Sequence, residues 1–323
     1  KVDIPRGHQN LRFFAHAVMN QKSIAFTDTE GVSEYINRSP IGPCALISPW
    51  NLPLYILTWK IAPCLAAGNT AICKPSEMTP MTAYLFSQMI NEAGLPPGTI
   101  NIIHGTGAKT GNALIKHPDV PVISFTGGTA TGGHIAKEVG PLFKKTSFEL
   151  GGKNPNIIFA DCDFEKALST SIKSSFLNQG EICLCGSRIF VEESLYDKFV
   201  ERFVEETEKL QVGSPFEKGT FVGALVSKPH LDKVKSYVEL AKEEGGKVLT
   251  SSEVKGLSEE NKNGYYMRPT VITGLSPQCR VQQEEIFGPV VTITPFKTED
   301  EVLEMANGVK YGLSATLWTE NAS

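Results

Sequence analysis

Residues 149–154 are Glu-Leu-Gly-Gly-Lys-Asn, and residues 178–183 are Asn-Gln-Gly-Glu-Ile-Cys. Between these two glycine turns, the polar residues 161–163 can cap a helix that runs to about Leu177, and the strand-like residues 188–191 follow. We therefore expect Cys183 in a helix-to-strand connection, where a thiol can be partly exposed and can reach a carbonyl carbon. A carboxylate within reach, for which Glu149 is the candidate, could take the proton of the thiol or of a water molecule.

Short apolar runs alternate with amphipathic segments on both sides of this stretch. Before it, strands are predicted at 41–48, 70–74, 99–103 and 120–125, and helices at 1–21, 54–67, 81–93 and 112–117. After it, strands are predicted at 156–159, 188–191, 265–272 and 290–296, and helices at 195–210, 230–244 and 299–307. Strands that alternate with helices across short turns predict an α/β fold with doubly wound parallel sheets.

The pattern divides into two α/β domains, with the boundary near Leu150. We expect residues 1–149 to form one domain, with strand ends suited to binding a ligand, from which residues 22–41 extend as a hairpin. Residues 150–323 are expected to form a second, catalytic domain.

The composition argues against several classes of protein. A net charge of −4 without a concentrated basic run argues against nucleic acid or an anionic membrane as a partner. The longest apolar run, 52–67, is interrupted by Lys60 and two prolines and is too short to span a bilayer. The seven cysteines include no pair or cluster with zinc spacing, so we expect no metal site and a reducing, cytoplasmic location. The chain shows no signal peptide and begins without methionine, and we expect further residues at both ends.

Loops that follow the predicted strands contain residues suited to binding and catalysis. Asn51, in Pro-Trp-Asn-Leu-Pro at 49–53, could donate a side-chain N–H to an oxyanion, although an isolated turn asparagine is usually structural. Lys74 and Glu77 follow the next strand, where doubly wound sheets bind ligands, although such a pair alone is usually solvated surface. Glycine-rich loops at 104–111 and 125–133 precede helices, whose first N–H groups can bind a pyrophosphate.

Taken together, these motifs resemble those of the aldehyde dehydrogenase superfamily. Glu-Leu-Gly-Gly-Lys-Asn and Gly-Glu-Ile-Cys are similar to its two signatures, and Glu-Ile-Phe-Gly-Pro at 285–289 is similar to its Glu-x-Phe-Gly-Pro motif. The resemblance spans essentially all 323 residues through five ordered motifs. It implies oxidation of an aldehyde to a carboxylic acid with a nicotinamide cofactor, and a homo-oligomer when the chain is complete.

The resemblance also assigns roles in the reaction. It makes Cys183 the nucleophile, Glu149 the general base and Asn51 a donor to the oxyanion. Cys185 lies two positions too late for the nucleophile, and we expect it to be a packing residue.

A further set of residues is expected, by the same resemblance, to bind NAD. Lys74 and Glu77 correspond to residues that hold the adenosine ribose, Glu285 to one that holds the nicotinamide ribose. The full set is Ser48, Trp50, Lys74, Glu77, Gly107, Gly111, Gly127, Gly128, Leu150, Glu285 and Phe287. We expect NAD to be preferred over NADP, because the Glu77 carboxylate would repel a 2′-phosphate.

Two positions depart from the family pattern. Gly128 stands where the family normally has serine, so a hydroxyl contact to phosphate is lost while the backbone donors remain. Ser48 stands where an apolar residue is common.

Within the family, the chain is most similar to 2-aminomuconate and 2-hydroxymuconate semialdehyde dehydrogenases. The similarity is carried by Asp-Ile-Pro-Arg at 3–6 and by residues 46–62. In that subgroup the arginine binds the carboxylate of the substrate, so Arg6 is the expected substrate-binding residue, with Arg12 as the nearest alternative.

Other functions remain open at this point. Betaine aldehyde or retinal is an alternative substrate, and a cofactor-independent cysteine hydrolase would use the same thiol on esters. A family member without catalytic activity is a third alternative, against which the presence of Cys183, Glu149 and Asn51 argues.

Overall fold

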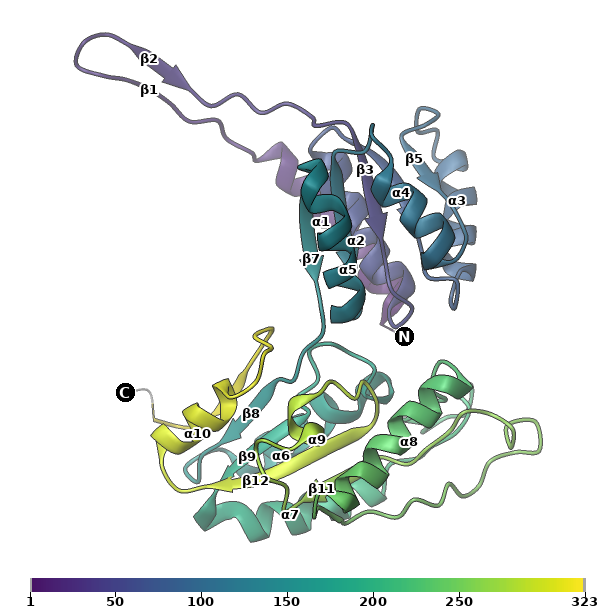
Figure 1. Ribbon diagram of the computed structural model, residues 1–323, viewed down its shortest axis with the longest axis vertical. Coiled ribbons are helices and arrows are strands. Elements are labelled where there is room, and N and C mark those ends of the chain that lie inside the picture. The colour runs from purple at the N-terminus through teal and green to yellow at the C-terminus, as the bar shows by residue number, and fades with distance from the viewer. Residues whose placement is uncertain (1, 322–323) are drawn as a thin grey trace. The chain divides into compact units, whose positions relative to one another are not determined.

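A computed structural model describes residues 2–321 of the chain (Figure 1). The backbone forms two compact units, Lys1–Leu150 and Gly151–Ser323. Each unit is built around one mainly parallel sheet with helices on its faces. The predicted α/β fold is confirmed.

The sheet of the first unit has five strands that are all parallel. Their order is β5 (Ile100–Ile102), β4 (Thr70–Lys74), β3 (Pro43–Ile47), β6 (Val122–Thr126) and β7 (Lys145–Glu149). The chain moves outward from β3 through β4 to β5 and then crosses to β6 on the other side of β3. The carboxyl ends of all five strands therefore share one edge, and the order reverses between β3 and β6, where doubly wound sheets bind ligands.

Alternation along β3 shows how the sheet is covered on both faces. Cys44 and Leu46 pack toward α2 (Pro53–Ala66) and α3 (Met81–Glu92). Ala45 and Ile47 pack toward α4 (Asn112–Lys116) and α5 (Thr129–Val139). All four side chains are buried, which explains why β3 appears in the sequence as a continuous apolar run.

The first helix, α1 (Asp3–Met19), packs against α2 through polar contacts as well as apolar ones. Both carboxylate oxygens of Asp3 accept hydrogen bonds from the first N–H groups of α2, at Leu54 and Tyr55. Asn10 is buried and donates to the Tyr55 carbonyl and the Thr58 hydroxyl. These contacts fix the start of α2, which directly follows the loop that contains Asn51.

A two-stranded ribbon leaves the first unit after α1. β1 (Ala25–Thr27) and β2 (Ser33–Tyr35) pair only with each other and extend away from the body of this unit (Figure 1). Its apolar side chains are solvent-exposed, among them Ile24, Phe26, Val32, Tyr35 and Ile36.

The sheet of the second unit has six strands, of which only β10 runs antiparallel to its neighbour. The order is β10 (Lys247–Val248), β11 (Thr270–Thr273), β12 (Val290–Phe296), β9 (Arg188–Glu192), β8 (Pro155–Ile158) and β13 (Thr316–Trp318). One face packs on α6 (Phe164–Phe176) and α7 (Glu193–Glu208). The opposite face packs on α8 (Lys228–Glu243) and α10 (Glu299–Asn307), with the short α9 (Arg280–Gln283) between them in the sequence.

The predicted elements agree with the structure to within a few residues, with one clear error. The strand predicted at 265–272 is only Thr270–Thr273, because Pro269 precedes it and the Tyr265 carbonyl accepts from the N–H of Leu225, outside the sheet. The sequence analysis did not predict β7, β10, β13 or α9, all of which have at most five residues. Within residues 2–321, no helix has the length and apolar character needed to span a bilayer.

Candidate active site

A left-handed turn of the backbone leads from α6 into residues 181–187, the connection to β9 that contains Cys183 and is called the cysteine loop below. Asn178, Gln179 and Gly180 have φ angles of 52°, 59° and 69° in succession, a conformation that non-glycine residues rarely adopt. The Gln179 Oε1 accepts a hydrogen bond of 3.1 Å from the N–H of Gly223, which holds the turn. The turn redirects the chain, so that Cys183 lies in the connection between α6 and β9 as predicted.

The Gly-Gly-Lys-Asn motif packs directly under this loop. A Cβ atom on Gly152 would lie 2.6 Å from the Cys183 carbonyl oxygen, so only glycine fits there. The buried Asn154 donates through Nδ2 to the carbonyls of Cys183 (2.7 Å) and Cys185 (2.9 Å). Its Oδ1 accepts from the N–H of Ser314 at 3.0 Å, which fixes the orientation of the amide. The two signature motifs are thus in direct contact, and the first positions the second.

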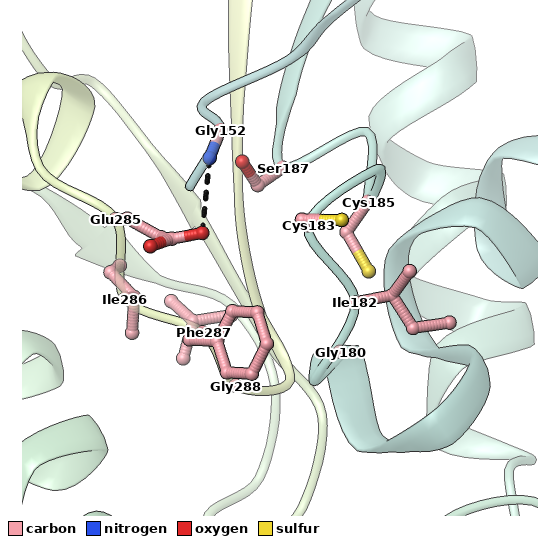
Figure 2. Close-up of a pocket in the computed structure, with 11 residues that line it drawn as sticks. Gly152, Gly180, Ile182, Cys183, Cys185, Ser187, Glu285, Ile286, Phe287 and Gly288 are labelled. Atoms are coloured by element: carbon pink, nitrogen blue, oxygen red, sulfur yellow. Dashed lines mark hydrogen bonds between the residues drawn. The ribbon is translucent and has the colours of Figure 1, made fainter. Parts of the chain in front are cut away.

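A pocket in the second unit brings the cysteine together with the Glu-x-Phe-Gly-Pro motif. Figure 2 shows Cys183 on one wall and Glu285 and Phe287 on the other, with Gly152 and Ser187 above them. Glu285 Oε1 accepts a hydrogen bond of 3.0 Å from the N–H of Gly152 (Figure 2). Three of the residues singled out in the sequence, Cys183, Glu285 and Phe287, therefore line one pocket.

The two cysteines of the loop differ in their surroundings. Cys185 is 8% exposed, and burial raises the pKa of its thiol to about 12, so that it stays protonated and unreactive near neutral pH. Cys183 is only partly buried and lies on the pocket surface. Exposure thus favours Cys183 as the reactive thiol.

Two charged groups beside the pocket are perturbed by burial. The Lys153 side chain is fully buried, and the loss of hydration lowers its pKa to about 7. Burial likewise raises the pKa of Glu285, while the Gly152 N–H and nearby lysines oppose that shift.

In the first unit, the predicted NAD-binding residues lie at the carboxyl edge of the sheet. Ser48 follows β3, and its buried hydroxyl has no hydrogen-bond partner among the described residues. Trp50 and Asn51 lie in the turn between β3 and α2, and the Trp50 carbonyl accepts from the Thr79 hydroxyl at 3.3 Å.

At the end of β4, Lys74 and Glu77 form an ion pair. The Lys74 Nζ lies 3.2 Å from Glu77 Oε2 and also donates to the Pro75 carbonyl at 3.0 Å. The other oxygen of Glu77 accepts from the N–H of Gly107 at 3.4 Å. Gly107 and Gly111 bound a single π-helical turn, and Gly111 faces the Lys74 side chain. The ion pair and the glycine turn are thus one cluster.

At the ends of β6 and β7, Gly127 donates its N–H to the Glu149 carbonyl at 3.0 Å. Gly128 is the N-cap of α5, and the space where its side chain would point is open. The Leu150 side chain fills the space beside Gly132 in α5, where a Cβ would approach to 2.5 Å. Glu149 itself is exposed at the end of β7.

Arg6 lies on α1, with its guanidinium 5.6 Å from the centre of the Tyr55 ring. It donates to the Gln9 side chain at 3.4 Å and forms no ion pair with residues 2–321. Because Asp3 binds the N-terminus of α2, Arg6 is held near the loop that contains Asn51.

Several residues of these sites were not singled out from the sequence. Lys60 is buried in α2 and donates to the Ser124 hydroxyl at 2.9 Å; burial lowers its pKa to about 8, and Glu149 partly offsets this shift. A single charge inside the apolar run 52–67 was the available signal. Asn154 has no such local signal, because its partners are 29 and 31 residues away.

Comparison with known proteins agrees with this geometry. The profile of the aldehyde dehydrogenase family matches residues 1–323. The chain is 53% identical to the 2-aminomuconic semialdehyde dehydrogenase of Danio rerio and 51% identical to that of Homo sapiens, covering 99% of this chain and 66% of each relative. It is 44% identical to the 2-hydroxymuconic semialdehyde dehydrogenase of Pseudomonas sp. (strain CF600), over 100% of this chain and 67% of that protein.

Solved structures give the same result. A putative aldehyde dehydrogenase from Burkholderia cenocepacia matches with a TM-score of 0.95 and 40% identity, over 99% of this chain and 65% of that one. An aldehyde dehydrogenase from Bacillus cereus, solved as an NAD⁺ complex, matches with a TM-score of 0.94 and 36% identity, over 99% of this chain and 64% of that one. The chain thus spans slightly less than two thirds of these proteins. By sequence and by fold, the chain belongs to the aldehyde dehydrogenase family.

Proposed function

We propose that the protein oxidises an aldehyde to a carboxylic acid, with NAD as the oxidant. The main support for this proposal is that one pocket is lined by the partly exposed Cys183 and by Glu285 and Phe287. A single active site would require these three residues to lie together. Family membership and the NAD⁺ complex of the Bacillus cereus relative support it.

The carboxyl edge of the sheet in the first unit offers polar groups suited to binding NAD. Two buried hydroxyls at the β3–β6 edge, those of Ser48 and Thr129, have no hydrogen-bond partner among the described residues. Both lie where the strand order reverses, which is where a dinucleotide would supply acceptors. The open space at Gly128, at the first turn of α5, leaves the helix N–H groups accessible to a pyrophosphate. The Glu77 carboxylate is suited to ribose hydroxyls.

In the proposed reaction, Cys183 attacks the aldehyde carbon as a thiolate and forms a thiohemiacetal. Asn51 and the backbone N–H of Cys183 donate to the oxyanion; one such donor typically contributes about a hundred- to a thousandfold in turnover. NAD, held by the residues at the carboxyl edge of the first sheet, would supply a hydride acceptor, and loss of a hydride from the thiohemiacetal carbon would leave a thioester on Cys183. Glu149 then removes a proton from the water molecule that hydrolyses the thioester.

In this mechanism the two domains have different roles. We propose that residues 1–149 bind NAD and supply Glu149 and Asn51, and that residues 150–323 carry the nucleophile. The buried amine of Lys60, whose pKa is lowered to about 8, lies close enough to Glu149 for their charges to interact.

We propose an acidic semialdehyde of the muconate type as the substrate, and 2-aminomuconate semialdehyde in particular. The names of the Danio rerio and Homo sapiens relatives support this choice. Arg6 supports it physically, because its guanidinium is exposed, has no carboxylate partner among residues 2–321 and is held beside the Asn51 loop. A planar guanidinium matches a carboxylate through two parallel hydrogen bonds.

Reduction of NAD by the purified protein tests the activity. Absorbance of the reduced nicotinamide should appear with the semialdehyde and should be lost in Cys183→Ala but retained in Cys185→Ala. Ester hydrolysis without any aldehyde-dependent reduction of NAD would instead favour a cysteine hydrolase. A panel that includes betaine aldehyde and retinal separates the substrate classes, since neither carries a free carboxylate for Arg6.

We also propose that the protein is a cytoplasmic homo-oligomer. The exposed apolar side chains of the β1–β2 ribbon support self-association, because monomers rarely leave a projecting ribbon of this kind uncovered. Light scattering of the purified protein measures the number of subunits, and a monomer at micromolar concentration would contradict the proposal.

A further inference from the structure

Two titratable side chains meet behind the cysteine loop, outside the set used above. Glu181, two residues before Cys183, has a side chain that is only 4% exposed, and His230, near the start of α8, has one that is 12% exposed. The His230 Nε2 lies 3.6 Å from Glu181 Oε1. The same oxygen accepts from the N–H of Val226 at 3.2 Å, and the Gln179 side chain also hydrogen-bonds to Glu181.

His230 also holds Phe287. Its Nε2 lies 2.7 Å from the Phe287 carbonyl oxygen, and the two rings meet edge to face at 6.2 Å. A carbonyl oxygen can only accept, so Nε2 carries the proton. Phe287 needs such support, because its φ of 63° is left-handed and unfavourable for a residue with a side chain.

Close packing leaves little freedom around this turn. A Cβ on Gly288 would lie 2.6 Å from the Val234 side chain of α8. A Cβ on Gly180 would lie 2.3 Å from the Gly288 carbonyl oxygen. The cysteine loop and the Phe287 turn therefore touch directly, and Glu181 and His230 connect them at the same place.

We propose that Glu181 and His230 are positioning residues that hold the Phe287 turn against the cysteine loop and so set the nucleophile relative to the nicotinamide side of the pocket. This inference rests on the proposed function. It extends that function, since it makes the geometry of the site depend on whether Glu181 carries a charge.

The charges around the pair determine its state near neutral pH. Burial raises the pKa of Glu181 to about 8, and burial lowers the pKa of His230, so both are neutral at pH 7. On α8, Lys233 further disfavours a charged His230, and it donates to the Glu285 carbonyl at 3.2 Å. From the cysteine loop the facing groups are Glu181 and Gln179, and from the Phe287 turn the carbonyl of Phe287. Of this pair, Glu181 is therefore the member that changes charge as the pH rises through about 8.

The rate at which iodoacetamide alkylates Cys183, followed by mass spectrometry between pH 6 and pH 9.5, tests the role of Glu181 without cofactor or substrate. A negative charge on Glu181, two residues before Cys183, would disfavour the thiolate, so the wild-type rate should fall below that of Glu181→Gln only above about pH 8, by about three- to tenfold. Below pH 7 the two rates should agree. Glu239→Gln, on the exposed side of α8, is the matched control and should follow the wild type.

Binding of NAD tests the role of His230. In His230→Phe the ring remains but the hydrogen bond to the Phe287 carbonyl is lost, and the dissociation constant for NAD should rise about tenfold. His230→Gln places an amide N–H near the former Nε2 and should restore most of the affinity. This rescue separates a positioning hydrogen bond from simple filling of space.

Superimposable alkylation profiles for the wild type and Glu181→Gln, or unchanged affinity for NAD in His230→Phe, would overturn the inference. If Glu181→Gln does not fold, the alkylation rate of the wild type against pH decides alone. It must then show, besides the ionisation of the thiol, a second inflection near pH 8 from Glu181. A wild type that binds no NAD and oxidises no aldehyde would refute the proposed function, while the alkylation profiles would still decide the role of Glu181.

Discussion

Replacement of Gly152 by alanine tests how tightly the two signature motifs are fitted together. The added Cβ would lie 2.6 Å from the Cys183 carbonyl oxygen, which is 0.8 Å short of the 3.4 Å at which ordinary contact begins. That carbonyl cannot move freely, because Asn154 holds it at 2.7 Å and also holds the Cys185 carbonyl. The Cys183 loop must therefore shift by several tenths of an ångström and lose part of the Asn154 bond.

We expect this shift to lower kcat/KM for the aldehyde about a hundredfold, the size of effect typical of a misplacement near 1 Å, and to destabilise the fold by about 1–3 kcal/mol. Steady-state reduction of NAD measures the first quantity and urea denaturation measures the second. Gly312→Ala is the control in the same unit, because nothing lies within 4 Å of its added Cβ. If Gly152→Ala keeps kcat/KM within twofold of Gly312→Ala, the contact does not position the nucleophile.

Three further changes test other parts of the site. Arg6→Ala should lower kcat/KM about ten- to a hundredfold on the acidic semialdehyde, because a charge-assisted bond contributes roughly 1.5–3 kcal/mol; equal losses on a neutral aldehyde of similar size would show that Arg6 only supports the fold. Glu77→Gln should narrow the preference for NAD over NADP, since it removes the negative charge that meets a 2′-phosphate; an unchanged ratio of the two kcat/KM values contradicts this role. In the wild type the pKa of Lys153 is about 7 in the folded state and 10.5 in the unfolded state, so the wild type gains stability as the pH rises from about 7 to 10.5. Lys153→Met removes the buried amine and should therefore raise the free energy of unfolding most below pH 7. If the difference in free energy of unfolding between Lys153→Met and the wild type stays constant from pH 7 to 10.5, the pKa of Lys153 is not lowered by burial.

Much of the fold could be predicted because local signals agree with it. Asp163 caps the N-terminus of α6 with its side chain, as the sequence indicates. The strand β4 has the same first and last residues as predicted. The elements that were not predicted are short strands and one short helix, whose apolar residues do not establish a period. The 265–272 error has the same origin, because an apolar run ahead of a proline resembles a strand although its backbone bonds elsewhere.

The site could be predicted only where its residues fall within recognisable motifs. Cys183, Glu285 and Phe287 were named from sequence, and the second unit brings them into one pocket. The residues that orient them, Asn154 and His230, act across 29 and 57 residues of chain, and no local pattern records such contacts. The requirement for glycine at 152 is likewise a property of the folded packing, since its φ is ordinary and a side chain is excluded by the Cys183 carbonyl oxygen at 2.6 Å and the Asn154 amide at 3.0 Å.

The left-handed turn before the cysteine has a consequence for the motions of the loop. Two of its residues, Asn178 and Gln179, have a backbone conformation that costs of order 1–3 kcal/mol each and persists only while surrounding contacts enforce it. One such contact, between Gln179 and the Gly223 N–H, joins the turn to a segment 44 residues away. We expect an opening of that segment to release the turn, and with it the cysteine, before the sheet unfolds. The amide hydrogens of this loop should accordingly exchange with solvent through low-energy local openings, while those of β9 and β12 exchange only through global unfolding. We therefore expect the position of Cys183 to depend on the loop around Gly223 more than on the stability of the unit as a whole.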